Sequence, residues 1–334
     1  MLSIVIPLFN EQDSLPLLFE RLLPVAASID PCYELILVDD GSTDSTRHLL
    51  ASAARGNPHL RVLSFTRNFG HQPAVTAGLD CATGDCVVVM DADLQDPPEL
   101  LPEMFALYRQ GFDIVSPQRT SRGGDSWFKR NSAKLFYKLM QKMVDRRVVP
   151  EVGDFRLFSR RAVHAICNFR EQHRFMRGLI AWLGLKEAIL PFERQCRVAG
   201  ETKYSLLNML RFSWVAITSF SGLPLRIALF TGMSFVALDI FLVIYILYVT
   251  LILKSVVPGW ASIIIVQALF SGVTLICLGL IGDYISRIYD ESKHRPLYVV
   301  EESTNLSQAT ISSARGLFLD PKPARAKSAT ANSI

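Results

Sequence analysis

The sequence predicts an α/β domain with a mostly parallel sheet, followed by two helices that cross a membrane. Short β-branched runs alternate with amphipathic stretches over residues 1 to 120, as strands and crossover helices do in such a sheet. Two long apolar runs near the C-terminus raise the mean hydropathy of the chain to +0.26. We therefore expect one α/β domain that is anchored by a helical hairpin.

Four strands are expected, and each ends at a cluster of polar or turn residues. The strand candidates are Ser3 to Ile6, Tyr33 to Val38, Arg61 to Phe65 and Cys86 to Met90. The clusters that follow them are Pro7 to Glu11, Asp39 to Asp44, Arg67 to Gly70 and Asp91 to Asp96. Ligands bind at the carboxyl ends of strands in open α/β sheets, so these clusters predict the functional site.

The two apolar runs have the length and composition of transmembrane helices. Ile227 to Leu253 carries only the charge of Asp239, and Trp260 to Gly282 carries none. At ~1.5 Å per residue, each run exceeds the ~30 Å hydrocarbon core of a bilayer. The predicted organisation is an α/β domain (1–200), juxtamembrane interfacial helices (201–225), two transmembrane helices (226–285) and a tail (286–334) that is polar and disordered beyond Glu302.

Basic residues set the expected orientation of the hairpin. They flank its outer ends at Arg211, Arg226, Arg287, Lys293 and Arg295, whereas the connector offers only Lys254. The positive-inside rule then places the α/β domain and both termini in the cytoplasm. Met1 leads straight into a strand, with no signal-peptide pattern.

Composition excludes two other classes of protein. The six cysteines form no CxxC pair, which argues against a zinc site and predicts free thiols. The net charge of +4 is modest and suits a face near anionic lipid, so nucleic acid is not needed to explain it.

A metal site is predicted at the segment DADLQ. Alternate side chains of an extended segment point the same way, so Asp91, Asp93 and Gln95 are expected to converge on one ion. All-oxygen ligation suits Mg²⁺ or Mn²⁺, with phosphate oxygens and water completing the shell. A bare DxD is common by chance, but its place at a strand end favours the functional interpretation.

A second carboxylate cluster lies in the segment VDDGSTDST. Asp40 is placed to accept hydrogen bonds from ribose hydroxyls or a base N–H, whereas Asp44 fits a plain turn and helix cap. The segment has no GxGxxG, so a dinucleotide-binding fold is not indicated.

Seven motifs together resemble the family 2 glycosyltransferases, specifically those that act on polyprenyl phosphates. The motifs are PLFNE, VDDGSTD, SFTRNFG, MDADLQDPPE, GDFRLFSR, RVAGETKYS and TSFSGLPLR. The resemblance runs from Ser3 to about Arg295 and includes the two-helix anchor. It implies a GT-A fold in a multi-pass protein of the cell inner membrane, and relatives suggest a homotetramer packed through the hairpins.

The resemblance also assigns site residues. Pro7, Phe9, Glu11, Val38 and Asp40 would hold the nucleoside, with Phe9 replacing a common tyrosine. The nucleotide sugar would contact Asp91, Ala92 and Asp93, and Asp93 and Gln95 would be the firmer metal ligands. The family's basic contacts to phosphates are matched by Arg119, Arg197 and Lys203.

The chemistry of such a transfer supports these cations. Joining a sugar pyrophosphate to a lipid phosphate brings two anions together, and their repulsion must be offset by metal and fixed positive charge. A phosphate monoester is largely dianionic at neutral pH, so it can attack the anomeric carbon without a strong base, which gives inversion. Asp154 is left with three possible roles: orienting a substrate, acting as a base, or forming a structural ion pair with Arg156.

The predicted reaction is transfer of glucose from UDP-glucose to undecaprenyl or another polyprenyl phosphate, for modification of envelope glycans. GDP-mannose, a UDP-N-acetylhexosamine and a UDP-aminoarabinose derivative are alternative donors. A processive polysaccharide synthase should carry a QxxRW segment and more membrane helices, neither of which is present. A non-enzymatic membrane scaffold or flippase subunit would not need carboxylates at successive strand ends.

Overall fold

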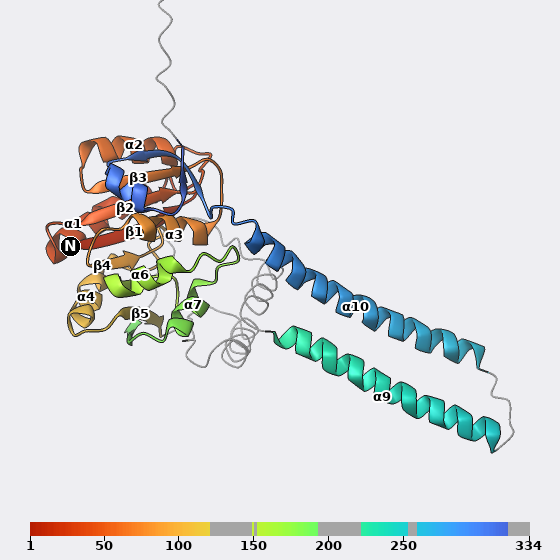
Figure 1. Ribbon diagram of the computed structural model, residues 1–334. Helices are drawn as coiled ribbons and strands as arrows, with labels where there is room; N and C mark the ends of the chain where they lie inside the picture. Colours follow the sequence, from red (N-terminus) through yellow and green to blue (C-terminus); the bar gives the residue numbers. More distant parts are fainter. Residues whose placement is uncertain (121–148, 150–151, 193–221, 253–258, 320–334) are drawn as a thin grey trace, which may run out of the picture.

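The computed structural model describes residues 1–120, 149, 152–192, 222–252 and 259–319, and these form one α/β domain and two long helices (Figure 1). The strands are β1 (Leu2–Leu8), β2 (Glu34–Asp39), β3 (Leu60–Phe65), β4 (Cys86–Val89), β5 (Ile114–Arg119), β6 (Arg156–Ser159), β7 (Glu187–Phe192), β8 (Val299–Thr304) and β9 (Leu317–Phe318). The helices are α1 (Leu15–Ile29), α2 (Thr46–Gly56), α3 (His71–Cys81), the 3-10 turn η1 (Pro98–Leu100), α4 (Leu101–Arg109), α6 (Arg160–Asn168), α7 (Met176–Leu183), α9 (Leu223–Leu251), α10 (Trp260–Ser292) and α11 (Gln308–Ser313).

The nine strands form one sheet in the order β7-β5-β6-β4-β1-β2-β3-β8-β9. The pairs β1–β2, β1–β4, β2–β3, β5–β7 and β8–β9 are parallel, and the pairs β3–β8, β4–β6 and β5–β6 are antiparallel. The predicted α/β domain with a mostly parallel sheet is therefore confirmed. The four predicted strands match β1 to β4 within two residues at each end.

Helices cover both faces of the sheet, because its central strands are apolar on both sides. Every residue of β1 is buried. Ile4 and Ile6 face one apolar cluster, which includes side chains of α1, α2 and α4, whereas Val5 faces the other, which includes side chains of α3, α6 and α7. The result is a three-layer arrangement that leaves the carboxyl ends of the parallel strands free for a site.

The register of the antiparallel strand β6 brings a later part of the chain to the same edge. Val89 of β4 pairs with Arg156 of β6. Asp91 lies two residues after Val89, and Asp154 lies two residues before Arg156. Because β4 and β6 are antiparallel, these two carboxylates lie at the same edge of the sheet. β5 also runs antiparallel to β6, and its last residue, Arg119, therefore ends at this edge.

The segment after the hairpin is part of the sheet, which corrects the expectation of a disordered tail beyond Glu302. β8 pairs with β3, and β9 pairs with β8, as Figure 1 shows for the blue C-terminal segment. Tyr298 has no exposed surface, stacks on Phe65 with ring centroids 5.3 Å apart, and donates a hydrogen bond to Asp80 Oδ2 at 2.7 Å. Residues 320–334 lie outside the described part of the chain.

Removing the Tyr298 hydroxyl is expected to destabilise the α/β domain. Asp80 is a buried carboxylate that also pairs with Arg170. Tyr298→Phe leaves it one donor short, at a cost of about 1.5–3 kcal/mol. Thermal unfolding of the full chain should show a lower Tm than wild type. Tyr108→Phe is the matched control, since its hydroxyl makes only a 3.4 Å exposed contact, and an equal loss in both variants would contradict the prediction.

The two long helices, α9 and α10, lie side by side and project away from the α/β domain (Figure 1). Phe235 of α9 packs against Phe270 of α10 with ring centroids 5.4 Å apart. Pro224–Tyr245 and Leu269–Ser292 are long and apolar enough to cross a membrane, with mean hydropathies of 2.3 and 1.7, and neither segment is buried within the chain. The predicted pair of apolar helices is confirmed, although α9 begins three residues early and α10 runs seven residues past the expected end at 285. Most of the predicted interfacial segment, residues 201–221, lies outside the described residues.

Candidate active site

The DADLQ segment forms a turn at the end of β4 and is not extended as expected. Leu94 has a φ of 54°, and the backbone N–H of Gln95 donates to Asp93 Oδ1 at 3.1 Å. Asp91, Asp93 and Gln95 are nevertheless partly exposed, whereas Ala92 and Leu94 are buried. Three oxygen-bearing side chains therefore reach the open side of this turn, and their donor chemistry fits Mg²⁺ or Mn²⁺.

The protein alone does not supply a complete metal site in the described part of the chain. Those residues contain no group of three or more His, Cys, Asp or Glu side chains that could hold a metal ion. Asp91 and Asp93 supply two carboxylates and Gln95 an amide oxygen, so a bound cation would need further oxygens from phosphate or water. Metal ligation by these three residues stays a prediction.

Asp91 lies in a crowded anionic environment. Burial raises its pKa to about 6, nearby Asp154, Asp96 and Asp93 act in the same direction, and His71 opposes them. His71 Nε2 lies 3.8 Å from Asp91 Oδ1. A site that gathers carboxylates in this way favours the arrival of a cation.

Asp154 is held by two cationic side chains and an amide. Arg177 Nε lies 3.1 Å from its Oδ1, His71 Nε2 lies 3.3 Å from its Oδ2, and Gln72 Nε2 donates to Oδ2 at 3.3 Å. Burial acts to raise the pKa of Asp154, but Arg177 and His71 outweigh it and hold the pKa well below its usual range. Asp154 is therefore ionised at neutral pH.

An ion pair of Asp154 with Arg156, one of the three roles considered for Asp154, is not the contact that forms. Arg156 Nη1 lies 3.3 Å from Glu187 Oε1, and Arg156 Nε donates to the backbone oxygen of Gly153 at 3.2 Å. The side chains at 154 and 156 both belong to ion pairs, but with partners from α3, α7 and β7.

Sequence reasoning missed His71, Gln72 and Arg177. His71 and Gln72 open α3 directly after the cluster Arg67 to Gly70, so the strand-end rule pointed to their position but not to their role. Burial lowers the pKa of His71, but the contacts with Asp154 and Asp91 outweigh it and raise the pKa to about 9. Arg177 lies in α7, far along the chain, and no pattern marks it.

Arg119 reaches the same turn from the end of β5. Its Nη2 lies 3.6 Å from Asp96 Oδ1, and its Nε is buried with no hydrogen-bond acceptor in the described part of the chain. It passes close over Gly153, where an added Cβ would lie 3.2 Å from Arg119 Nη2. Arg197 and Lys203, the other two predicted cations, lie outside the described residues.

The residues predicted to hold the nucleoside lie at the ends of β1 and β2. Pro7 and Val38 are buried and occupy paired positions in these strands. The side chains of Phe9, which is 40% exposed, and Glu11, which accepts a hydrogen bond from Ser14 Oγ at 2.7 Å, follow β1. The structure thus places these four residues at the carboxyl ends of the neighbouring strands β1 and β2. Their contact with a nucleoside stays a prediction.

Asp40 already forms hydrogen bonds within the protein. Its two carboxylate oxygens accept the backbone N–H groups of Phe69 at 2.7 Å and Gly70 at 2.9 Å, which fixes the loop before α3. Gly41 has a φ of 70°, and an added Cβ there would lie 2.4 Å from the carbonyl carbon of Arg67, so only glycine permits this approach. Burial raises the pKa of Asp40, while the two N–H groups act to lower it. Its predicted role toward ribose or base would use the remaining lone pairs.

Comparisons with known proteins match this arrangement to a family. Residues 3–167 match the model of Glycosyl transferase family 2. The chain is 42% identical over 301 residues to the uncharacterized glycosyltransferase YkcC of Bacillus subtilis, covering 90% of this chain and 93% of that one. It is 36% identical over 300 residues to the bactoprenol glucosyl transferase of Shigella phage SfV, covering 90% of this chain and 98% of that one.

Among solved structures, glucosyl-3-phosphoglycerate synthase of Mycobacterium tuberculosis, crystallised with Mn²⁺, UDP and phosphoglyceric acid, shows a TM-score of 0.48 at 19% identity over 65% of this chain and 76% of that one. The sheet with its strand-end carboxylates and the sequence matches together define a glycosyltransferase with a GT-A-like α/β domain. The chain belongs to glycosyl transferase family 2.

Proposed function

We propose that this glycosyltransferase transfers glucose from UDP-glucose to undecaprenyl or another polyprenyl phosphate, with inversion and with a divalent metal. The bactoprenol glucosyl transferases that resemble it over 90% of its length support a glucosyl group as the transferred sugar and a polyprenyl lipid as the acceptor class. The other nucleotide sugars considered above are alternative donors for the same site.

One observation carries the proposal: the sheet brings two oppositely charged halves of a site together. The register of β4 and β6 places Asp154, with its partners His71 and Arg177, beside Asp91. The turn at Asp91 and Asp93 offers oxygen ligands, which attract a cation and the pyrophosphate bound to it. The cations beyond it suit a second anion, which is what joining a sugar pyrophosphate to a lipid phosphate requires.

Different residues of the chain would bind the metal, the phosphates and the nucleoside. Asp93, Asp91 and Gln95 would hold the metal, which supplies positive charge to the departing nucleoside diphosphate. Arg119, whose Nε lacks an acceptor among the described residues, would bind a phosphate oxygen, together with Arg197 and Lys203. The end of β1 and β2, with Phe9 and Glu11, would receive the nucleoside.

Asp154 fits a positioning role better than that of a base. Its pKa is held well below the usual range, so it is a weak proton acceptor. The acceptor phosphate needs no strong base, because it is largely dianionic at neutral pH. We infer that Asp154 orients His71 and Arg177, whose positive charges then face the phosphate groups.

Membrane insertion follows from the exposed apolar surface of α9 and α10. Their apolar segments are not buried within the chain, and water would solvate such surfaces at high cost. We propose that both helices span the inner membrane, with the domain and termini in the cytoplasm, and that copies associate through the hairpins, as a homotetramer.

Radiolabel transfer tests this function. The full chain in detergent should move label from UDP-glucose into an organic-extractable lipid only when polyprenyl phosphate is present. A panel of UDP- and GDP-sugars would identify the donor. Failure of every nucleotide sugar to label the lipid would favour a non-enzymatic role and contradict the proposal.

A further inference from the structure

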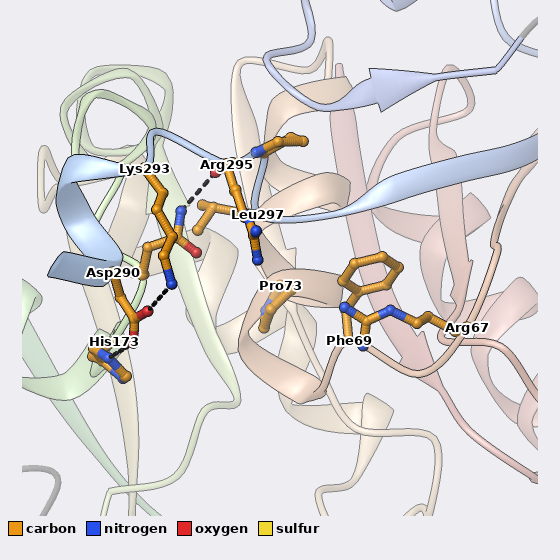
Figure 2. A pocket seen from close by; sticks show the side chains of 10 residues that line it. Arg67, Phe69, Pro73, His173, Asp290, Lys293, Arg295 and Leu297 are labelled. Atoms are coloured by element: carbon orange, nitrogen blue, oxygen red, sulfur yellow. Dashed lines mark hydrogen bonds and ion pairs between the residues drawn. The ribbon is translucent and has the colours of Figure 1, made fainter. Parts of the chain in front are cut away.

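A cavity of about 300 Å³ lies where the end of α10 meets the α/β domain (Figure 2). Its wall comes from three separate parts of the chain: the loop before α3 and the first turn of that helix, the segment between α6 and α7, and the end of α10 with the residues that follow it. The lining residues are Arg67, Phe69, Pro73, Gln172, His173, Asp290, Lys293, Arg295, Pro296 and Leu297. We call this cavity the junction pocket.

The junction pocket carries excess positive charge. Asp290, its one carboxylate, is engaged by Lys293 Nζ at 3.0 Å and by His173 Nε2 at 3.5 Å. Arg67 and Arg295 have no carboxylate partner in the part of the chain that the structure describes. The Arg67 guanidinium lies 4.1 Å from the centroid of the Phe69 ring, which holds it in place without neutralising it.

The charge is not explained by the helix end alone. Cations near a helix C-terminus complement its partial negative charge, and Lys293, at the C-cap of α10, fits that role. Arg295 lies beyond the cap, and Arg67 comes from a different part of the fold. In Figure 2, Arg295 lies between Lys293 on one side and Phe69 and Arg67 on the other.

The position of the junction pocket links the apolar helices to the candidate active site. α10 continues from the uncharged run Trp260 to Gly282 up to Ser292, so its last ten residues rise about 15 Å beyond that run. Pro73 of the pocket wall is two residues from His71, which contacts Asp154. The junction pocket therefore lies between the end of α10 and the first turn of α3, the helix that carries His71.

We propose that the junction pocket binds a phosphate group carried on a lipid, with Arg67 and Arg295 as its ligands. Guanidinium groups present paired N–H donors that match phosphate oxygens, and the apolar helix supplies the neighbouring lipid phase. A volume of about 300 Å³ is at the small end of ligand sites, which suits a headgroup and not a whole lipid. The identification of the lipid as the acceptor rests on the proposed function, whereas its phosphate chemistry does not.

Binding measured without nucleotide sugar tests this inference. The full chain in phosphatidylcholine nanodiscs would be titrated with polyprenyl phosphate, with uncharged polyprenol and, separately, with phosphatidylglycerol. The variant Arg67→Gln/Arg295→Gln should bind the phosphate-bearing lipid at least about tenfold more weakly than wild type, the effect of losing a charge-assisted hydrogen bond. The matched control is Arg55→Gln, an exposed arginine in the last turn of α2, which should leave binding unchanged.

The results of these titrations would identify the lipid or overturn the proposed site. A loss confined to polyprenyl phosphate identifies the acceptor, and a loss confined to phosphatidylglycerol identifies a membrane phospholipid; both support the pocket. Equal affinities in the double variant and the Arg55→Gln control would overturn it, provided that UDP binding shows both variants to be folded. Inorganic phosphate that binds as tightly as the lipids would also overturn it, since the site would then take a free anion. A wild-type chain that binds the lipid phosphate but transfers no sugar would refute only the proposed function.

Discussion

Asp93→Ala is expected to reduce sugar transfer at least about a thousandfold, because it removes the carboxylate through which the metal would stabilise the departing diphosphate. Asp93 is partly exposed, and its side chain accepts the backbone N–H of Gln95 across the turn. The loss should appear in kcat. Excess Mg²⁺ or Mn²⁺ should not restore it. The measurement is initial-rate transfer into extractable lipid at saturating nucleotide sugar.

Metal removal from the wild-type chain tests the same site without mutation. EDTA should abolish transfer, and added Mn²⁺ or Mg²⁺ should restore it. Asp44→Ala is the matched control for Asp93→Ala, since Asp44 is another strand-end carboxylate and accepts the backbone N–H groups of Gln12 and Thr46. It should lose about 1 kcal/mol of stability as a helix-start residue and keep most activity. Full activity of the wild type in chelator would refute the metal site.

The sequence was sufficient for the central sheet because its signal is local. β1 to β4 are apolar runs bounded by turn residues, and burial on both faces makes such runs stand out. β8 was missed for the opposite reason. It lies near the edge of the sheet and is mostly polar, with the sequence VVEEST, so the sequence alone resembles a solvated loop and its pairing with β3 is not evident.

Site residues could be predicted where they lie together in one sequence segment. Contacts between residues from distant segments could not be predicted. Asp91 and Asp93 could be identified from their place after a strand, although the turn at Leu94 could not. The contacts of Asp154 depend on the register of β6 and on where α7 lies, which are long-range features. His71 and Arg177 therefore carried no signal in the linear sequence.

Asp154→Asn is expected to lower kcat by about 10²–10³-fold while the KM for the nucleotide sugar changes little, the size of loss seen when one electrostatic contact in an active site is removed. The amide keeps the shape of the side chain but removes the charge that faces His71 and Arg177. Binding of UDP should persist, because the hydrogen bonds and ion pairs of Asp154 are with His71, Gln72 and Arg177 and not with the residues proposed to hold the nucleoside.

A second measurement separates positioning from a merely structural role. Asp154 is the largest contributor that raises the pKa of His71 to about 9, so the variant should lower that pKa, as followed by NMR of the imidazole. Asp113→Asn is the matched control: Asp113 pairs with Arg161 and accepts from Ser159 at 3.0 Å, outside the site, and its loss should leave both kcat and the His71 pKa unchanged. Near-normal turnover of Asp154→Asn would show that its charge has no part in transfer. A reduced kcat with an unshifted His71 pKa would show instead that Asp154 acts on the substrate directly and not through the imidazole.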